Sequence, residues 1–192
     1  MTNVRAGRLA GRPRQDLTDE QARIYDAVTG GRRGQGPQFF PLTREDGSLA
    51  GPFNAMLLSP DVGMAMQSLG SALRYSTSLT DAAREIAILT VAADLDNAFE
   101  WYAHEPIARH CGVSDHVIAA IKLRQPPALP VLAEQAAYEL AIVLLRSSDV
   151  TDAEYHAAVG AIGERGVFEV SALVGYYSML ASQLRLFRVG TD

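Results

Sequence analysis

Apolar residues recur every three or four positions along most of this 192-residue chain. Val62, Met66 and Leu69 show this spacing in one stretch. A period near 3.6 residues predicts α-helices. Residues 86–93 are apolar on nearly every face, which predicts a helix at the centre of the fold. Long runs with a period of two, which mark half-buried strands, are missing from the pattern. The sequence therefore predicts an all-α fold.

Capping residues and helix breakers set the bounds of the expected helices. Thr18 and Thr80 precede helical patterns, and Thr151 followed by Glu154 has the spacing of a capping box. Either Asp94 or Asp96 can cap the helix expected from residue 97. Residues 37–60 are rich in glycine and proline and predict a long ordered loop. The expected helices cover residues 16–30, 61–75, 80–93, 97–110, 114–122, 131–147, 152–164 and 167–186.

Acid–base groups gather within the apolar segment 85–104. Asn97, Glu100 and His104 are three and four residues apart, so they share one face of a helix. Glu85 lies in the most apolar helix of the chain, where a buried carboxylate needs a partner. Histidine can exchange a proton near neutral pH, and a nearby carboxylate can raise its pKa or set its tautomer. These residues are a candidate acid–base site.

Two other interpretations of these residues stay open. Glu100 and His104 can form an ordinary surface pair four residues apart, worth about 0.2–0.5 kcal/mol. With Glu85 they also offer a mixed oxygen and nitrogen ligand set. The segment does not have the HExxH pattern, and His110 lies six residues beyond His104, on a different helix face. The adjacent Trp101 favours a pocket, and we expect no metal.

Composition and charge narrow the classes of function. The chain is 48% hydrophobic and 20% charged, as expected for one globular domain, and its net charge is −5. Residues 1–36 carry seven arginines and four acidic residues, and they contain no basic patch with interleaved aromatic side chains. This pattern predicts a solvated arm or one that packs on a neighbouring subunit, and it does not predict nucleic-acid binding.

The cysteine content argues against disulfide and CxxC chemistry, and the hydropathy argues against a membrane-spanning segment. Cys111 is the single cysteine, so the chain has no internal disulfide and no CxxC redox pair. No run of about 18 apolar residues could span a membrane, and the N-terminus does not resemble a signal peptide. We therefore expect a cytoplasmic protein that does not bind membranes.

Several segments resemble the carboxymuconolactone decarboxylase family, which also contains the alkylhydroperoxidase D proteins. They are G-P-F-N-A-M-L-L-S-P (51–60), R-E-I-A-I-L (84–89), N-A-F-E-W-Y-A-H (97–104) and V-G-Y-Y (174–177), within a similarity that covers residues 51–186. The resemblance implies an alkylhydroperoxidase D-like helical bundle with a central helical hairpin, made by residues 80–93 and 97–110. It also implies a homo-oligomer, either a trimer or a hexamer, in agreement with the large apolar area of the last helix.

The peroxidase branch of that family carries a glutamate, a CxxC pair and a histidine on this frame. In this sequence the glutamate falls on Glu85 and the histidine on His104, whereas the two cysteine positions fall on Asn97 and Glu100. A thiolate is the nucleophile that attacks a peroxide, and Cys111 lies outside the motif. The resemblance is therefore to the decarboxylase branch.

That branch implies a cofactor-independent lyase that acts on a small carboxylated lactone or a related metabolite. His104 would donate a proton or stabilise the developing oxyanion, Glu100 would orient His104, and Glu85 would complete the network. Arg84 could hold the substrate carboxylate, although it is expected to point away from Glu85. The expected catalytic residues are His104, Glu100 and Glu85, and the expected substrate-binding residues are Trp101, Asn97, Tyr177 and Arg84.

We also expect a division between an N-terminal arm with the first helix (1–45) and a helical domain (46–192). Two alternative functions stay open. One is a peroxidase-related detoxification protein without a CxxC pair, and the other is a non-catalytic oligomer that binds a ligand.

Overall fold

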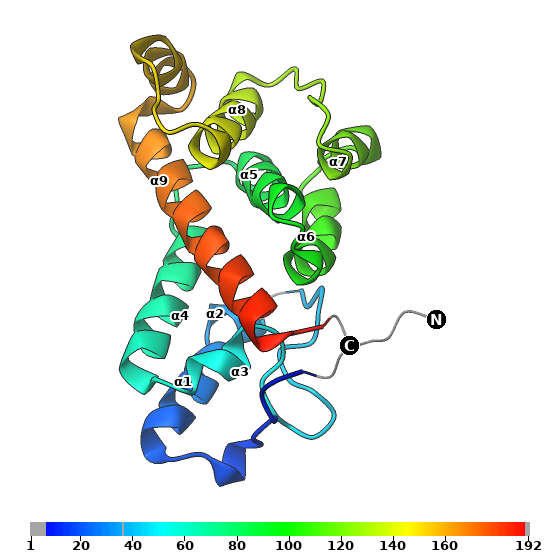
Figure 1. The fold of residues 1–192 in the computed structure, drawn as a ribbon, viewed down its shortest axis with the longest axis vertical. Helices are drawn as coiled ribbons and strands as arrows, with labels where there is room; N and C mark the ends of the chain where they lie inside the picture. The colour runs from blue at the N-terminus through cyan, green and yellow to red at the C-terminus, as the bar shows by residue number, and fades with distance from the viewer. Residues whose placement is uncertain (1–6, 36, 191–192) are drawn as a thin grey trace. The chain divides into compact units, whose positions relative to one another are not determined.

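Helices make up the regular structure of this protein (Figure 1). The computed structural model describes residues 7–35 and 37–190, and no β-strand occurs within these ranges. The helices are η1 (Arg14–Asp16), α1 (Asp19–Thr29), α2 (Arg32–Gln35), α3 (Phe53–Met56), α4 (Pro60–Tyr75), α5 (Asp81–Asp94), α6 (Ala98–His110), α7 (Asp115–Lys122), α8 (Leu132–Arg146) and α9 (Asp152–Phe187). The predicted all-α fold is confirmed. Across the described residues, no helix combines the length and the hydropathy that a membrane span requires.

The chain forms two compact units. Residues 1–72 together with 182–192 make one unit, and residues 73–181 make the other. All seven expected site residues belong to the second unit. The division expected after residue 45 separates an arm from a domain, and it stays a prediction. Residues 1–6 and 36 of that arm lie outside the described residues.

Side-chain caps begin several helices where the sequence predicts them. The Thr80 hydroxyl accepts a hydrogen bond from the Ala83 N–H at 3.2 Å and starts α5. Thr18 forms a capping box with Gln21 at the start of α1. Because the first N–H groups of a helix have no acceptor within the helix, such caps fix where it begins.

The start of α6 differs from the prediction. The helix was expected to include Asn97, with Asp94 or Asp96 as its cap. Instead, Asn97 is the N-cap, and its Oδ1 accepts a hydrogen bond from the Glu100 N–H at 3.2 Å. Asp96 has a φ of 51° and makes the turn between the two helices, whereas Asp94 is the last residue of α5. An asparagine side chain is as good a cap as aspartate, which explains the difference.

Short helices occur in two segments that were expected to lack them. Helix α2 lies in the glycine-rich break after α1, and α3 lies in the expected loop 37–60. Each is four residues long, too short to show a helical period in the sequence.

Helix α9 contains the predicted break between two helices. Gly163 has φ 70° and ψ 166°, values that are not helical, so α9 consists of two helical segments joined at this residue. A left-handed φ is readily adopted by glycine because glycine has no Cβ. The break was expected between residues 164 and 167 and lies slightly earlier.

Helix α5 is the centre of the second unit. Its residues 83–92 are all buried, and it packs against α6, α7 and α8. Helices α5 and α6 follow each other in sequence and form the expected central hairpin. One apolar cluster joins three helices through side chains such as Leu89 of α5, Trp101 of α6 and Ile118 of α7. This packing presents one buried face of α6 to α5.

Candidate functional site

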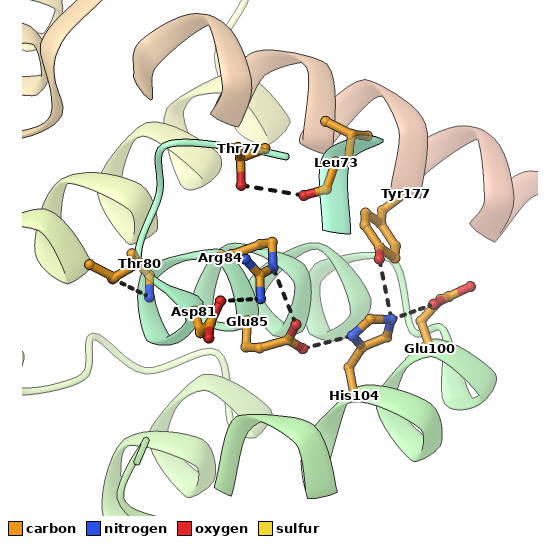
Figure 2. A network of polar contacts seen from close by, with 10 residues as sticks. Leu73, Thr77, Thr80, Asp81, Arg84, Glu85, Glu100, His104 and Tyr177 are labelled. Atoms are coloured by element: carbon orange, nitrogen blue, oxygen red, sulfur yellow. Dashed lines mark hydrogen bonds and ion pairs between the residues drawn. The ribbon is translucent and has the colours of Figure 1, made fainter. Parts of the chain in front are cut away.

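A buried histidine on α6 lies between two carboxylates (Figure 2). His104 Nδ1 is 2.7 Å from Glu85 Oε2, and His104 Nε2 is 3.4 Å from Glu100 Oε2. Glu85 is fully buried, and Glu100 and His104 are each 4% exposed. The shorter distance is that of a charge-assisted hydrogen bond, whereas the longer one is an ion pair. Each ring nitrogen therefore faces its own carboxylate.

Ordinary helix geometry brings these three groups together. Glu100 and His104 are one turn apart on α6, so they project from the same face. Glu85 lies in the second turn of α5, the other helix of the hairpin. The Asn97 cap fixes the start of α6 and therefore the face on which Glu100 and His104 lie. The sequence places all three groups within a span of 20 residues.

The two carboxylates favour the protonated form of His104. Burial by itself lowers the pKa of His104, because it disfavours the charged ring. The charge of Glu85 and the polar contacts with Glu100 and Glu85 outweigh that effect and raise the pKa from 6.5 to about 9. A pKa of about 9 makes the imidazolium, with a proton on each ring nitrogen, the favoured form of His104 at neutral pH. The charged ring carries a proton that it can donate, and its raised pKa makes it a weaker acid than an ordinary imidazolium.

Tyr177 of α9 contacts the ring nitrogen that faces Glu100. Its hydroxyl oxygen is 3.3 Å from His104 Nε2, and the two rings meet edge to face with centroids 5.2 Å apart. Burial, followed by the charges of Glu100 and Glu85, raises the pKa of Tyr177 well above its ordinary value. The phenol is therefore neutral over the whole physiological pH range. Nε2 thus faces one charged acceptor and one neutral hydroxyl.

Arg84 lies beside Glu85, contrary to the expectation that it would point away. Its Nε is 3.7 Å from Glu85 Oε1, and its second terminal nitrogen is 2.7 Å from Asp81 Oδ1. The side chain of Arg84 is 9% exposed, whereas that of Asp81 is 71% exposed. A long arginine side chain can reach back along the helix to a neighbour, which a count of helix faces does not consider. Asp81 was missed, although its spacing of three residues from Arg84 is a pairing signal.

The structure places Asn97 and Trp101 in other surroundings. The Asn97 side chain caps α6, as described above. The Trp101 indole N–H donates to Glu105 Oε2 at 2.5 Å, and Lys122 Nζ of α7 lies 5.2 Å from the centre of its ring. Trp101 thus packs toward α7 as part of the apolar cluster. The expected role of both residues in substrate binding stays a prediction.

Several buried polar atoms of this region make no hydrogen bond with the described residues. They are Arg84 Nε, Glu85 Oε1, Asn97 Nδ2 and Glu100 Oε1. Buried polar groups are nearly always paired, because an unpaired one costs about 1–3 kcal/mol. Two of these atoms, Glu85 Oε1 and Glu100 Oε1, belong to residues that contact His104. Buried polar atoms without a hydrogen bond are rare in native proteins, and a functional site is one explanation for them.

The thiol of Cys111 is poorly placed for nucleophilic chemistry. Cys111 caps the C-terminal end of α6 and is partly buried. Burial, together with the charges of Glu85 and Asp81, raises the pKa of its thiol, so the reactive thiolate is disfavoured. Within residues 7–35 and 37–190, no group of three or more potential metal ligands has the arrangement of a metal site.

Comparison with known proteins identifies the fold. A peroxidase-related protein from Ralstonia eutropha JMP134, described as an alkylhydroperoxidase AhpD core, superposes with a TM-score of 0.75 at 15% identity, over 97% of this chain and 92% of that chain. A protein of unknown function from Agrobacterium tumefaciens, whose name relates it to the antioxidant defence protein AhpD, gives 0.62 at 16% identity, over 71% and 94%. A cysteine-to-alanine variant of the debrominase Bmp8, in complex with 2,3,4-tribromopyrrole, gives 0.69 at 14% identity, over 100% and 93%.

These similarities establish an AhpD-like all-α fold for this chain. Identities of 14–16% carry no information on activity. No protein-family model and no curated protein matches the sequence significantly. Function therefore has to be argued from the buried site itself.

Proposed function

We propose that this protein is a cofactor-independent acid–base enzyme, a lyase that removes carbon dioxide from a small carboxylated lactone or a related metabolite. The observation that supports this proposal best is the buried His104, bound at Nδ1 by Glu85 and flanked at Nε2 by Glu100 and Tyr177. This arrangement prepares one proton, on Nε2, for transfer. A general acid of this kind typically contributes about 10²–10⁴-fold to a rate.

The proposed reaction uses that proton once per turnover. The bond between the substrate and its carboxylate carbon breaks, carbon dioxide leaves, and the electron pair stays on the substrate as a dienolate. Nε2 of His104 then gives its proton to the carbon that lost the carboxylate. The neutral ring takes up a proton from solvent and returns to its charged state. The positive ring also stabilises the dienolate while it exists.

Glu85 and Glu100 have different roles in this scheme. Glu85 holds Nδ1 at 2.7 Å, so the proton on that nitrogen stays in place and the ring keeps its orientation. Glu100 lies at the longer distance of 3.4 Å and relays the proton from solvent back to Nε2. Tyr177 is the neutral group on this side of the ring, so its hydroxyl can hydrogen-bond the substrate that is bound beside Nε2.

The absence of a cysteine pair favours this proposal over a thiol peroxidase. Asn97 and Glu100 occupy the positions where the sequence resemblance places the two cysteines, and the only cysteine has a raised pKa. A peroxidase without a thiolate would need another group that attacks a peroxide. The carboxylates and the phenol near His104 are weak nucleophiles toward a peroxide, so we favour proton transfer.

The test is carbon dioxide release from carboxymuconolactone and from a panel of small carboxylated lactones and ketoacids. Wild type should release carbon dioxide, and the variant Glu85→Gln/His104→Gln should not. The double variant removes both members of the buried pair, so it leaves no unpaired charge from that pair and should fold. His116→Gln, on an exposed histidine of α7, is the matched control and should keep full activity.

Other outcomes would contradict the proposal. Equal turnover by wild type and the double variant, with thermal melts showing both folded, would remove His104 from the chemistry. Peroxide consumption that survives Cys111→Ala, without any carbon dioxide release, would favour the detoxification alternative. Ligand binding without turnover of any compound in the panel would favour a non-catalytic oligomer. Analytical ultracentrifugation would test the proposed trimer or hexamer.

A further inference from the structure

We propose that Arg84 is a positioning residue that acts through Glu85 to set the acidity and the orientation of His104. This inference rests on the proposed role of His104 as a proton donor. It replaces substrate contact as the role of Arg84, and it adds Asp81 to the site as the group that holds Arg84.

The geometry is a continuous series of charged groups from the surface to the buried ring. Asp81 Oδ1 pairs with a terminal nitrogen of Arg84 at 2.7 Å, and Arg84 Nε faces Glu85 Oε1 at 3.7 Å. The other oxygen of Glu85, Oε2, binds His104 Nδ1 at 2.7 Å. Glu85 thus divides its two oxygens between a guanidinium and an imidazolium. Figure 2 shows the four side chains in this order.

Charge balance gives Arg84 its effect. The buried groups around the ring are two carboxylates, from Glu85 and Glu100, and two cations, from Arg84 and the protonated His104. Without Arg84, the positive charge of His104 would have to balance the negative charges of both carboxylates. The proton on the ring would then be held more tightly, and His104 would be a weaker acid. Arg84 therefore keeps His104 acidic enough to give up its proton near neutral pH.

Other charged and titratable groups near the ring do not provide this balance. Those that face His104 directly are Glu85 from α5, Glu100 from α6 and Tyr177 from α9. Both carboxylates hold the proton on the ring, and the phenol is neutral. Arg74 of α4 acts on Tyr177 by charge, where it is a minor influence. Arg84 is the cation in contact with a carboxylate that binds the ring.

Asp81 has the opposite effect on the acidity of His104. It is exposed and pairs with Arg84 in the first turn of α5, so it draws the guanidinium toward the surface. Without the charge of Asp81, Arg84 would pair with Glu85 alone. Glu85 would then attract the proton of His104 less strongly. Substitutions of Arg84 and Asp81 should therefore move the titration of His104 in opposite directions. A merely structural role for the pair would not give opposite signs.

The experiment is a ¹⁵N NMR titration of the His104 ring in the full-length protein. In Arg84→Gln the midpoint should rise by about half a pH unit to one unit, and in Asp81→Asn it should fall by a smaller amount. Arg84→Lys keeps the charge and should restore most of the wild-type value. Arg146→Gln is the matched control, because Arg146 pairs with Asp94 at the other end of α5, and its midpoint should not change. With an active substrate, Arg84→Gln should lower kcat about three- to tenfold and leave KM nearly unchanged.

The outcomes separate this inference from the proposed function. Midpoints that move in opposite directions support the inference, even if no lactone is turned over. Unchanged midpoints in folded Arg84→Gln and Asp81→Asn overturn it, even if carbon dioxide release is confirmed. A rise in KM without a change in midpoint would also overturn it, because that result would return Arg84 to substrate binding.

Discussion

Glu85 Oε2 and His104 Nδ1 lie 2.7 Å apart although 19 residues separate them in the sequence. This pair joins α5 to α6 across the central hairpin, and both of its members are buried. Taking two charges out of water is costly, and the cost is recovered only when both partners are present. The pair therefore connects the stability of the hairpin to the protonation of the proposed catalytic group.

Stability should decrease as the pH rises from about 6.5 to about 9. The folded-state pKa of His104, about 9, is above the value of 6.5 that applies in the unfolded chain. The contribution of the protonated ring is thus complete below pH 6.5 and is lost as the pH passes through 9. This contribution to the free energy of unfolding amounts to at most about 3 kcal/mol. Urea unfolding at a series of pH values measures it, and a flat profile in this range would contradict the assignment.

Removal of one member of the buried pair should cost more than removal of both. His104→Gln leaves Glu85 and Glu100 without their shared cation and should lower the free energy of unfolding by about 3–5 kcal/mol. Glu85→Gln/His104→Gln replaces the pair by neutral amides and should cost about 1–2 kcal/mol. A double-mutant cycle by urea unfolding gives the coupling energy. Additive losses would mean that the two side chains do not interact.

Loss of the Tyr177 hydroxyl should affect activity more than stability. Tyr177→Phe keeps the ring that packs on His104 and removes only the hydroxyl oxygen, 3.3 Å from Nε2. We expect a loss of about 1 kcal/mol in stability and about tenfold in kcat. Tyr155→Phe, on an exposed tyrosine of α9, serves as the control. The role proposed for Tyr177 would be wrong if the Phe variant retained the kcat of wild type.

Alanine substitutions at the two glycines near the break in α9 should change the stability of the protein in opposite directions. Neither Gly160 nor Gly163 has other atoms within 4 Å of an added Cβ, so no clash is expected at either position. Gly163 has a φ of 70°, where alanine is strained, and Gly163→Ala should destabilise by about 1 kcal/mol. Gly160 lies within a helical segment, and Gly160→Ala should stabilise by about 0.5–1 kcal/mol. Equal shifts in Tm for both variants would argue against a fixed break at Gly163.

Much of the fold could be predicted from the sequence because local rules determine it. The period of apolar residues predicts where helices lie, and threonine caps such as Thr80 predict where they start. The four-residue helices α2 and α3 were missed because so short a segment shows no period. The cap of α6 was assigned to an aspartate because asparagine and aspartate are equivalent as caps, and only the backbone of Asp96 decides between them.

The candidate site was predictable only in part. Helical spacing places Glu100 beside His104, and the need of a buried carboxylate for a partner predicts Glu85. Spacing does not say which neighbouring helix a side chain meets, so the packing of Trp101 toward α7 could not be foreseen. It also does not describe how far a flexible side chain reaches, and for that reason Arg84 was expected to point away from Glu85.

The role of His104 as a proton donor depends on the protonation state of its ring at neutral pH. A ¹⁵N NMR spectrum of the ring at pH 7.5, assigned by comparison with Glu85→Gln/His104→Gln, reports whether one or both nitrogens carry a proton. We predict an imidazolium with both nitrogens protonated, because Glu85 and Glu100 together outweigh the effect of burial. A neutral ring with a single protonated nitrogen at that pH would remove His104 as the proton donor.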